Sequence, residues 1–390
     1  MVWKEASVMD ERSRFCLEFE RGHVSMTELC RVFGISRPTG YKWLGRFEAG
    51  GVAALADRSR ARRTQPHAYP ASVRALVIQS RKRHPTWGAA KLRVVLARSH
   101  PDLQLPSVTT METILRDARL TRPRRRRSRR LHGAFGEPGC DDRPNGVWAV
   151  DYKGQFRLGD GSYCYPLTVT DSASRYLLGC VALTSTRYAP ARQAFERLFA
   201  EYGVPEKIRS DNGSPFASTG VARLSRLSVY WMTLGIDPHR IRPGKPQDNG
   251  RHERMHRTLK AETTRPPATT RPGQQRRFNR FRREYNEVRP HEGLGMQCPA
   301  DVYEPSTAAA MPRLYVYPGH WEQRLVSMNG QISWKKTLVF ISESLAGQQV
   351  GLVEVDDGIW KVCFRHITLG RLNTRNKRPA FEMLRSRGRS

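Results

Sequence analysis

The stretch Asp248-Asn249-Gly250-Arg251-His252-Glu253-Arg254-Met255-His256-Arg257-Thr258-Leu259-Lys260 places a glutamate inside a strongly basic segment. Read as a helix, it puts Asn249, Glu253 and Arg257 on one face, because residues four apart lie one turn above another. The basic neighbours favour the charged form of the Glu253 carboxylate. A solvated helix face is the ordinary explanation of such a segment, so its meaning depends on acidic residues elsewhere in the chain.

Two aspartates stand where a hydrophobic strand pattern ends. Val147-Trp148-Ala149-Val150 runs into Asp151, and Lys207-Ile208-Arg209-Ser210 runs into Asp211. The dipeptide Asn212-Gly213 then marks a turn. Each aspartate is therefore expected at the end of a strand, where a buried element meets polar surroundings.

The region 146–305 alternates strand and helix patterns. Three successive strands are followed by helix, strand, helix, strand and the helix with Glu253, which indicates an α/β core with a mixed sheet and helices packed on it. We expect Asp151 and Asp211 on adjacent strands, with Glu253 on a helix that crosses above them. Three carboxylates at one place suit Mg²⁺ or Mn²⁺, and such ions assist phosphoryl transfer.

Other polar residues compete for roles near these acids. Asp171 also follows a strand, but with Ser172 it is more typical of a turn. His252 and His256 have the i, i+4 spacing of helical metal ligands, although we prefer contact with the DNA backbone or with solvent. Contacts with substrate phosphates beside the acids are expected from Lys245, Asn249, Arg251 and Lys260.

The chain has 390 residues and a formal net charge of +31. Such a charge favours a polyanion, and nucleic acid is preferred over an anionic membrane because no basic amphipathic helix stands out. No apolar run is long enough to span a bilayer, and the N-terminus lacks the apolar core of a signal peptide. The scattered cysteines indicate a reducing cytoplasm and argue against disulfides and structural zinc.

Residues 8–50 show three short helix patterns that predict a helix-turn-helix DNA-binding domain. Ser25 is a helix N-cap candidate with Glu28 three residues later, and Ser36 is another before the last helix. That helix would enter the major groove of double-stranded DNA and present Arg37, Thr39, Lys42 and Arg46. Gly40 weakens the pattern, because glycine in a helix interior is unfavourable by roughly 1 kcal/mol.

Residues 70–122 predict a second helix-turn-helix-like domain, and two linked modules would read a longer DNA site than one. The basic linker 123–145 follows, and its arginine-rich start is more typical of a phosphate-contacting arm than of a nuclear-localisation signal. After the core, alternating patterns and the turn Asp357-Gly358 predict a small β-barrel over 312–370. Residues 371–390 are basic and are expected to be disordered.

The motifs around the three acids resemble those of a DDE transposase of the bacterial insertion-sequence type with a retroviral-integrase-like catalytic core. The resemblance is carried by Trp148-Ala149-Val150-Asp151-Tyr152, by Arg209-Ser210-Asp211-Asn212-Gly213-Ser214-Pro215-Phe216, and by residues 242–260, 285–295 and 299–303. It covers roughly residues 10–305. The interval from Asp211 to Glu253 is longer than in retroviral integrases, and a helix-turn-helix pair replaces their zinc-binding module.

The resemblance implies a ribonuclease H-like fold for residues 146–305, with Asp151, Asp211 and Glu253 as a catalytic triad that binds Mg²⁺ or Mn²⁺. It also implies an enzyme that binds transposon-end DNA, cleaves it and joins the 3′-hydroxyl to target DNA, as a homo-oligomer on DNA in the bacterial cytoplasm. A non-catalytic DNA-binding regulator derived from a transposase is the alternative. The complete set of three acids favours catalysis, and cleavage of RNA would not require two DNA-reading modules.

Overall fold

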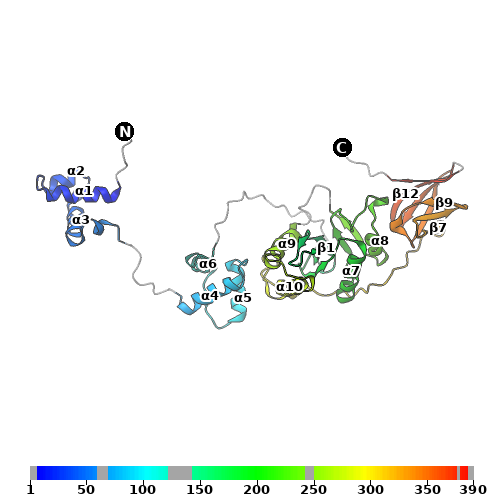
Figure 1. Cartoon of the computed structure of the whole chain (residues 1–390), viewed down its shortest axis with the longest axis horizontal. Helices are drawn as coiled ribbons and strands as arrows, with labels where there is room; N and C mark the ends of the chain where they lie inside the picture. The colour runs from blue at the N-terminus through cyan, green and yellow to red at the C-terminus, as the bar shows by residue number, and fades with distance from the viewer. Residues whose placement is uncertain (1–6, 59–68, 122–142, 242–249, 376–377, 385–390) are drawn as a thin grey trace. The chain divides into compact units, whose positions relative to one another are not determined.

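The computed structural model describes residues 7–58, 69–121, 143–241, 250–375 and 378–384 (Figure 1). The chain divides into two compact units, Met1–Tyr69 and Pro70–Ser390. The first unit contains one helical domain. The second contains another helical domain, an α/β core and a C-terminal β domain. Across the described ranges, no helix is both long and apolar enough to cross a membrane.

The first unit is a three-helix domain, as its sequence predicts. Its elements are α1 (Val8–Glu20), α2 (Met26–Val32), α3 (Arg37–Gly50) and a 3-10 turn (Val52–Leu55). Phe15, Leu29 and Trp43 belong to its buried core. Ser25 caps α2, because its hydroxyl oxygen accepts a hydrogen bond from the Glu28 amide at 3.3 Å.

Gly40, the weak point of the predicted recognition helix, is explained by packing. A Cβ at this position would lie 2.7 Å from Cys30 Sγ and 2.9 Å from Phe15 Cζ. Any side chain would therefore push α3 away from the other two helices. The close approach of the helices offsets the conformational cost of a glycine within a helix.

The second helical domain begins the second unit. Its helices are α4 (Ala71–Arg83), α5 (Ala89–Ser99) and α6 (Val108–Asp117). Trp87 is buried among them. Polar side chains connect this domain to the core: the Thr86 hydroxyl donates to Glu262 Oε1 at 2.6 Å, and Arg98 pairs with Asp301 at 3.3 Å.

The core of the second unit is a six-stranded mixed sheet of order β2-β3-β1-β5-β6, with β4 paired to β3. Its strands are β1 (Val147–Tyr152), β2 (Phe156–Arg157), β3 (Tyr163–Asp171), β4 (Leu177–Leu183), β5 (Lys207–Ser210) and β6 (Asp237–Arg240). The strands β1, β3 and β4 are antiparallel neighbours, whereas β1, β5 and β6 run parallel. This mixed pairing is the one expected from the order of strands and helices.

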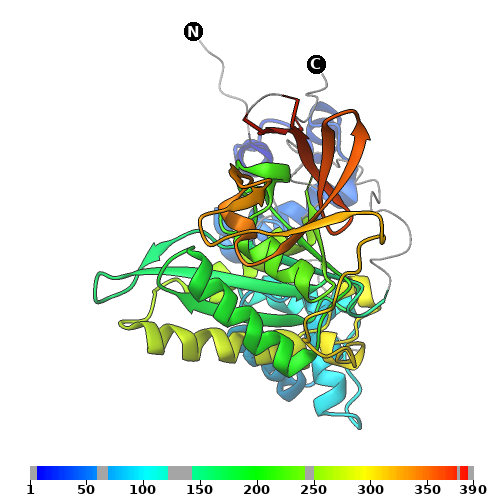
Figure 2. The ribbon, with the colours of Figure 1, turned by 90° about the vertical axis from the view of Figure 1, so that its right-hand side faces the viewer.

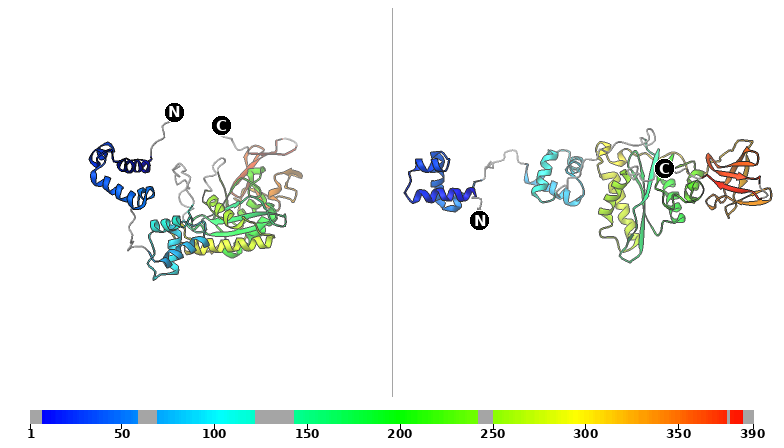
Figure 3. Two further views of the ribbon diagram at one scale, coloured as in Figure 1. Left: turned by 60° about the vertical axis from the view of Figure 1, so that its left-hand side comes forward. Right: turned by 90° about the horizontal axis from the view of Figure 1, so that it is seen from above.

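Helices cover both faces of this sheet (Figure 3). They are α7 (Tyr188–Tyr202), α8 (Arg226–Thr233), α9 (Gly250–Thr263) and α10 (Arg271–Arg283). On one face, α7 and α8 share a hydrophobic cluster with β1 and β3 that includes Trp148, Phe195 and Trp231. On the other face, Met255 of α9 and Phe278 of α10 pack in a separate cluster.

The predicted helix between β5 and β6 is preceded by a short turn of a different kind. This is a 3-10 turn at Val221–Arg223, and α8 begins at Arg226. Ser225 caps α8, because its hydroxyl oxygen accepts a hydrogen bond from the Ser228 amide at 3.1 Å. This local cap, rather than the hydrophobic pattern, sets where the helix begins.

The C-terminal domain contains a five-stranded and a two-stranded sheet around one hydrophobic cluster (Figure 2). Its strands are β7 (Glu322–Leu325), β8 (Gln331–Trp334), β9 (Thr337–Phe340), β10 (Gln349–Asp356), β11 (Ile359–Phe364), β12 (Ile367–Asn373) and β13 (Ala380–Met383). The larger sheet has the order β13-β12-β11-β10-β7, and its two edge strands do not pair with each other among the described residues. Closure into the predicted barrel is therefore not confirmed.

The prediction of disorder from residue 371 onward is wrong for two segments. The strand β12 continues to Asn373, and β13 pairs with it so that Phe381 lies opposite Leu372. The basic composition is compatible with a strand, because a few apolar residues at alternate positions suffice to extend an existing sheet.

Candidate active site

The ends of two parallel strands bring Asp151 and Asp211 together. The strands β1 and β5 pair with Ala149 opposite Arg209. Two residues further along this register, Asp151 comes beside Asp211, whose charge raises the pKa of Asp151. The predicted adjacency of the two strands is thus confirmed.

The turn after β5 fixes the position of Asp211. Its Oδ1 accepts a hydrogen bond from the Gly213 amide at 3.1 Å. A Cβ at Gly213 would lie 3.1 Å from Asp211 Oδ2, so a larger residue would crowd the carboxylate. The Asn212 side chain donates to the Ile241 carbonyl at 3.1 Å and connects this turn to the end of β6.

Glu253 approaches the two aspartates from α9. The buried face of α9 consists of His252, Met255, His256, Leu259 and Thr263. Glu253 itself is exposed, and its charge contributes to the raised pKa of Asp151. The third acid is therefore on a helix that packs over the sheet, as its sequence pattern suggests.

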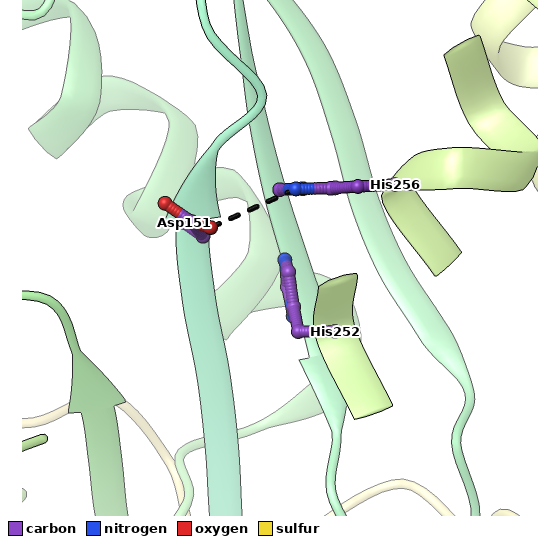
Figure 4. A group of neighbouring side chains, drawn as sticks. All are labelled: Asp151, His252 and His256. Atoms are coloured by element: carbon purple, nitrogen blue, oxygen red, sulfur yellow. Dashed lines mark ion pairs between the residues drawn. The ribbon is translucent and has the colours of Figure 1, made fainter. Parts of the chain in front are cut away.

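His252 and His256 are buried, so the preferred assignment to DNA contact or solvent is wrong. The Nε2 atoms of His252 and His256 lie 2.7 and 2.6 Å from Thr168 Oγ1, and His252 Nδ1 lies 3.0 Å from Thr170 Oγ1. His256 Nδ1 faces Asp151 Oδ2 at 3.6 Å (Figure 4). Because Thr168 and Thr170 alternate along β3, both point to the same face and bind one turn of α9.

The Thr168 hydroxyl determines how protons are shared in this buried network. It donates its one hydrogen to the Asp151 carbonyl at 3.0 Å, so the Nε2–H groups of both imidazoles donate to it. His252 Nδ1 then accepts from Thr170, and the unprotonated Nδ1 of His256 faces the Asp151 carboxyl group. Burial lowers the pKa of His252 to about 3 and that of His256 to about 2, so both rings are neutral.

Asp151 lies in surroundings that disfavour its charged form. Burial, and then the charges of Asp211 and Glu253, raise its pKa to about 7, while Lys153 acts in the opposite direction. A divalent cation would relieve such a group of like charges, and carboxylate oxygens are ligands that Mg²⁺ and Mn²⁺ prefer. The residues present therefore fit a divalent cation.

A second set of potential ligand atoms consists of Asp151, His252 and His256, which lie within 4.8 Å of one another. Both nitrogens of His252 and Nε2 of His256 are already in hydrogen bonds with threonine hydroxyls. Among the four ring nitrogens, only Nδ1 of His256 keeps a lone pair that is free to bind a metal ion in this arrangement. The set is therefore a poorer match to a metal ion than the three carboxylates.

The predicted DNA-contacting residues of α3 lie in the first unit. Arg37 and Lys42 are exposed, and the Thr39 hydroxyl is 2.9 Å from that of Ser36. The side-chain cations of Lys42 and Arg46 lie 5.0 and 4.8 Å from the centre of the Trp43 ring. Contact between these residues and DNA stays a prediction.

The predicted DNA contacts near the acids have different surroundings. Lys260 is exposed on α9, whereas the Arg251 guanidinium donates to the Ser172 carbonyl at 3.0 Å. Lys245 and Asn249 lie outside the described residues. Arg251 is thus exposed on α9, and its guanidinium group is hydrogen-bonded to the turn after β3.

Several functional neighbours of Asp151 were not predicted. Thr168 and Thr170 lie in a strand that has a hydrophobic pattern, and no motif in the sequence singles out Lys153. The available signal was the position of His252 and His256 on the apolar stripe of α9. Asp171, by contrast, is the expected turn residue, although it accepts hydrogen bonds from the amide and hydroxyl of Ser174, at 2.8 and 2.6 Å, rather than from Ser172.

Comparisons with known families agree with this architecture. Two models of an integrase core domain match residues 141–246 and 234–299, and two models of a homeodomain-like domain match residues 9–56 and 39–115. The chain is therefore a protein with an integrase core domain and homeodomain-like domains before it. These matches support the predicted transposase or integrase type.

Relatives with curated descriptions match only part of the chain. The Pol polyprotein of feline endogenous virus ECE1 is 31% identical over 123 residues, which are 32% of this chain and 11% of that protein. The Gag-Pol polyprotein of baboon endogenous virus (strain M7) is 30% identical over 123 residues, 32% of this chain and 7% of that protein. The chain thus spans a small part of the length of these relatives.

Solved structures give weaker likenesses. A chain of the simian T-cell lymphotropic virus intasome in complex with PP2A regulatory subunit B56 gamma is 15% identical with a TM-score of 0.37, covering 75% of this chain and 97% of that one. The HTLV-2 integrase catalytic core domain in complex with magnesium is 14% identical with a TM-score of 0.32, covering 42% of this chain and 98% of that one.

Proposed function

We propose that this protein is a DDE-type DNA transposase or integrase that cleaves DNA ends and joins their 3′-hydroxyl groups to target DNA. Asp151, Asp211 and Glu253 are the proposed catalytic residues. The observation that carries the proposal is that Asp151 and Asp211 lie at the ends of the paired strands β1 and β5, and that the charges of Asp211 and of Glu253 on α9 add to burial in raising the pKa of Asp151, inside a matched integrase core domain.

The three carboxylates would hold Mg²⁺ or Mn²⁺. When bound, such an ion supplies positive charge that stabilises the attacking and leaving oxygens of phosphoryl transfer. The chain itself contributes the fixed positions of the acids: a sheet for Asp151, a glycine turn for Asp211 and a packed helix for Glu253.

His256 is the proposed positioning residue for Asp151. Nε2 of its neutral ring is hydrogen-bonded to the Thr168 hydroxyl. Nδ1, on the other side of the ring, lies 3.6 Å from the Asp151 carboxyl group. At that distance the ring packs beside the carboxyl group without a hydrogen bond to it, so the proposed support of Asp151 runs through Thr168, a hydrogen-bonded partner of the kind that commonly affects metal affinity. Thr168 also contacts the Asp151 carbonyl, so one hydroxyl supports both the backbone and the side chain of Asp151.

The helical domains would recognise double-stranded DNA at the element's ends. The exposed residues of α3, Arg37 and Lys42, suit phosphate and base contacts in the major groove. Joining two DNA ends to a target requires that both ends be held together, so we propose that the protein acts as a homo-oligomer on DNA. A bacterial cytoplasmic location accompanies this proposal.

The replacement Asp211→Asn tests catalysis separately from binding. It keeps the shape of the side chain and removes the charge, so we expect strand joining to fall by at least about a hundredfold while binding of an end-containing duplex stays nearly unchanged. Asp237→Asn is the matched control, because Asp237 is an exposed aspartate on the neighbouring strand β6. Undiminished joining by Asp211→Asn would show that the acids are wrongly assigned, and a wild-type protein that binds ends without cutting them would favour the regulator alternative.

A further inference from the structure

Five cationic side chains gather where the second helical domain meets the core. Lys91 is on α5, Arg175 lies between β3 and β4, Arg251 and Arg254 are on α9, and Arg289 follows α10. We propose that these five residues, the cationic cluster, form a site for backbone phosphates of double-stranded DNA next to the active site, with Lys91, Arg175, Arg251 and Arg254 as the contacts and the buried Arg289 adding charge behind them. The inference rests on the proposed function and deepens it, because it names a surface that would hold the DNA during the reaction.

The segment 289–293 contains Arg289 and contacts the side chain of Arg175. The guanidinium group of Arg175 lies so close to Gly293 that a Cβ there would overlap it. The guanidinium carbon of Arg289 is 5.7 Å from the centre of the Trp87 ring, and Trp87 precedes Lys91 by four residues. This arrangement places Arg175 and Arg289 at opposite ends of one short segment.

His291 lies in the middle of the same segment and is buried. Its Nε2 atom has no hydrogen-bond partner among the described residues. Burial, followed by the charges of Lys91, Arg289 and Arg175, lowers the pKa of His291 to about 3. Cations from the helical domain and from the core therefore act on one neutral ring.

Two members of the cluster are half-buried cations without partners. Lys91 and Arg175 make no hydrogen bond or ion pair with the residues that the structure describes, and burial is the main cause that lowers the pKa of each. Acids are few: Arg289 pairs with Glu262 at 3.3 Å, and Glu292 favours the charge of Lys91. Desolvated like charges destabilise a folded protein unless an anion joins them.

The surroundings of the cluster favour DNA as that anion. Lys91 lies within the match to a homeodomain-like domain, whereas Arg251 and Arg254 flank Glu253 on α9. A phosphate backbone passing over these residues would run from a DNA-binding domain toward the three acids. Arginine is well suited to such contacts, because its guanidinium group can donate two parallel hydrogen bonds to a phosphate.

The test uses two neutralising variants of the full chain, Lys91→Met and Arg175→Gln. Their matched controls are Lys336→Met before β9 and Arg187→Gln before α7, which remove the same charge from exposed positions outside the cluster and outside the helical domains. Each cluster variant should bind a random-sequence DNA duplex roughly tenfold more weakly at low salt. The slope of log affinity against log salt should fall by about 1 relative to the wild type. The controls should change both quantities less.

Thermal unfolding of the DNA-free protein distinguishes binding from a structural role. Because the two charges are desolvated and unpaired, the cluster variants should melt at the same temperature as the wild type or higher. Weaker DNA binding together with a lower melting temperature would overturn the inference, as would DNA binding equal to that of the controls. Polyglutamate that binds the wild type as tightly as DNA does, and loses affinity in the cluster variants, would also overturn it in favour of an acidic protein partner. A wild-type protein that binds no duplex would instead contradict the proposed function.

Discussion

At the scale of the residue, Asp151 shows how position changes an ordinary carboxyl group. Its place at the end of β1 follows from a hydrophobic run in the sequence, and the strand pairing agrees. Its surroundings could not be predicted in the same way, because Thr168, His256 and Lys153 come from separate parts of the chain. Local patterns report burial and direction, whereas contacts between distant residues depend on packing.

The raised pKa of Asp151 gives a stability test in the metal-free protein. The pKa is about 7 in the folded state against an ordinary value of 3.8, so the folded protein binds this proton more tightly than the unfolded chain does. The contribution of Asp151 to stability is therefore neutral below pH 3.8 and becomes unfavourable as the pH rises to about 7. Asp151→Asn should be more stable than the wild type at pH 8, by an amount on the order of 3 kcal/mol, and the difference should shrink toward pH 4.

Urea unfolding in the presence of a chelator measures this difference. His252 and His256 titrate in both proteins, so their effect largely cancels in the comparison. Asp237→Asn serves as the control, since its aspartate is exposed on β6. A difference between wild type and Asp151→Asn that is the same at pH 5 and pH 8 would contradict the assigned pKa.

At the scale of the element, the sequence correctly predicts that α9 is a helix, but it wrongly predicts that His252 and His256 face DNA or solvent. Its basic face, with Glu253 and Arg257, is exposed, and Met255 and Leu259 are buried. The two histidines belong to the buried face because two threonines of β3 are there to receive them. A histidine reads as polar in a pattern, so its burial becomes evident only when its hydrogen-bond partners are known.

The contact of α9 with Asp151 can be tested through His256→Leu, which removes both ring nitrogens and keeps an apolar side chain. We expect the affinity for Mn²⁺ to fall roughly tenfold to a hundredfold, as is usual when a partner behind a metal ligand is removed. Calorimetric titration with Mn²⁺ measures this directly, and His256→Gln should restore part of the affinity because its amide can again donate a hydrogen bond to Thr168, which holds the Asp151 carbonyl. A variant that stays folded and binds Mn²⁺ like the wild type would remove His256 from its positioning role.

At the scale of the whole molecule, the order of domains could be read from the chain, but the closure of sheets could not. Helical patterns before residue 122 and the α/β alternation after residue 146 correspond to observed elements. The C-terminal strands also appear, together with β13, which the basic composition did not suggest. Whether the edges of a sheet meet depends on long-range pairing, which short alternating segments do not specify.

The proposed cleavage and joining of DNA depends on one assignment. It is that three acids from distant parts of the chain hold a divalent cation beside bound DNA. Titration of Mn²⁺ at pH 8 into the wild type, Asp151→Asn, Asp211→Asn, Glu253→Gln and the control Asp237→Asn tests it most directly. We expect each of the first three replacements to weaken binding by at least about tenfold and the control to leave it unchanged. Equal affinity in the wild type and the three variants, with loss of binding on replacement of His252 or His256, would place the ion on the histidines and contradict the assignment.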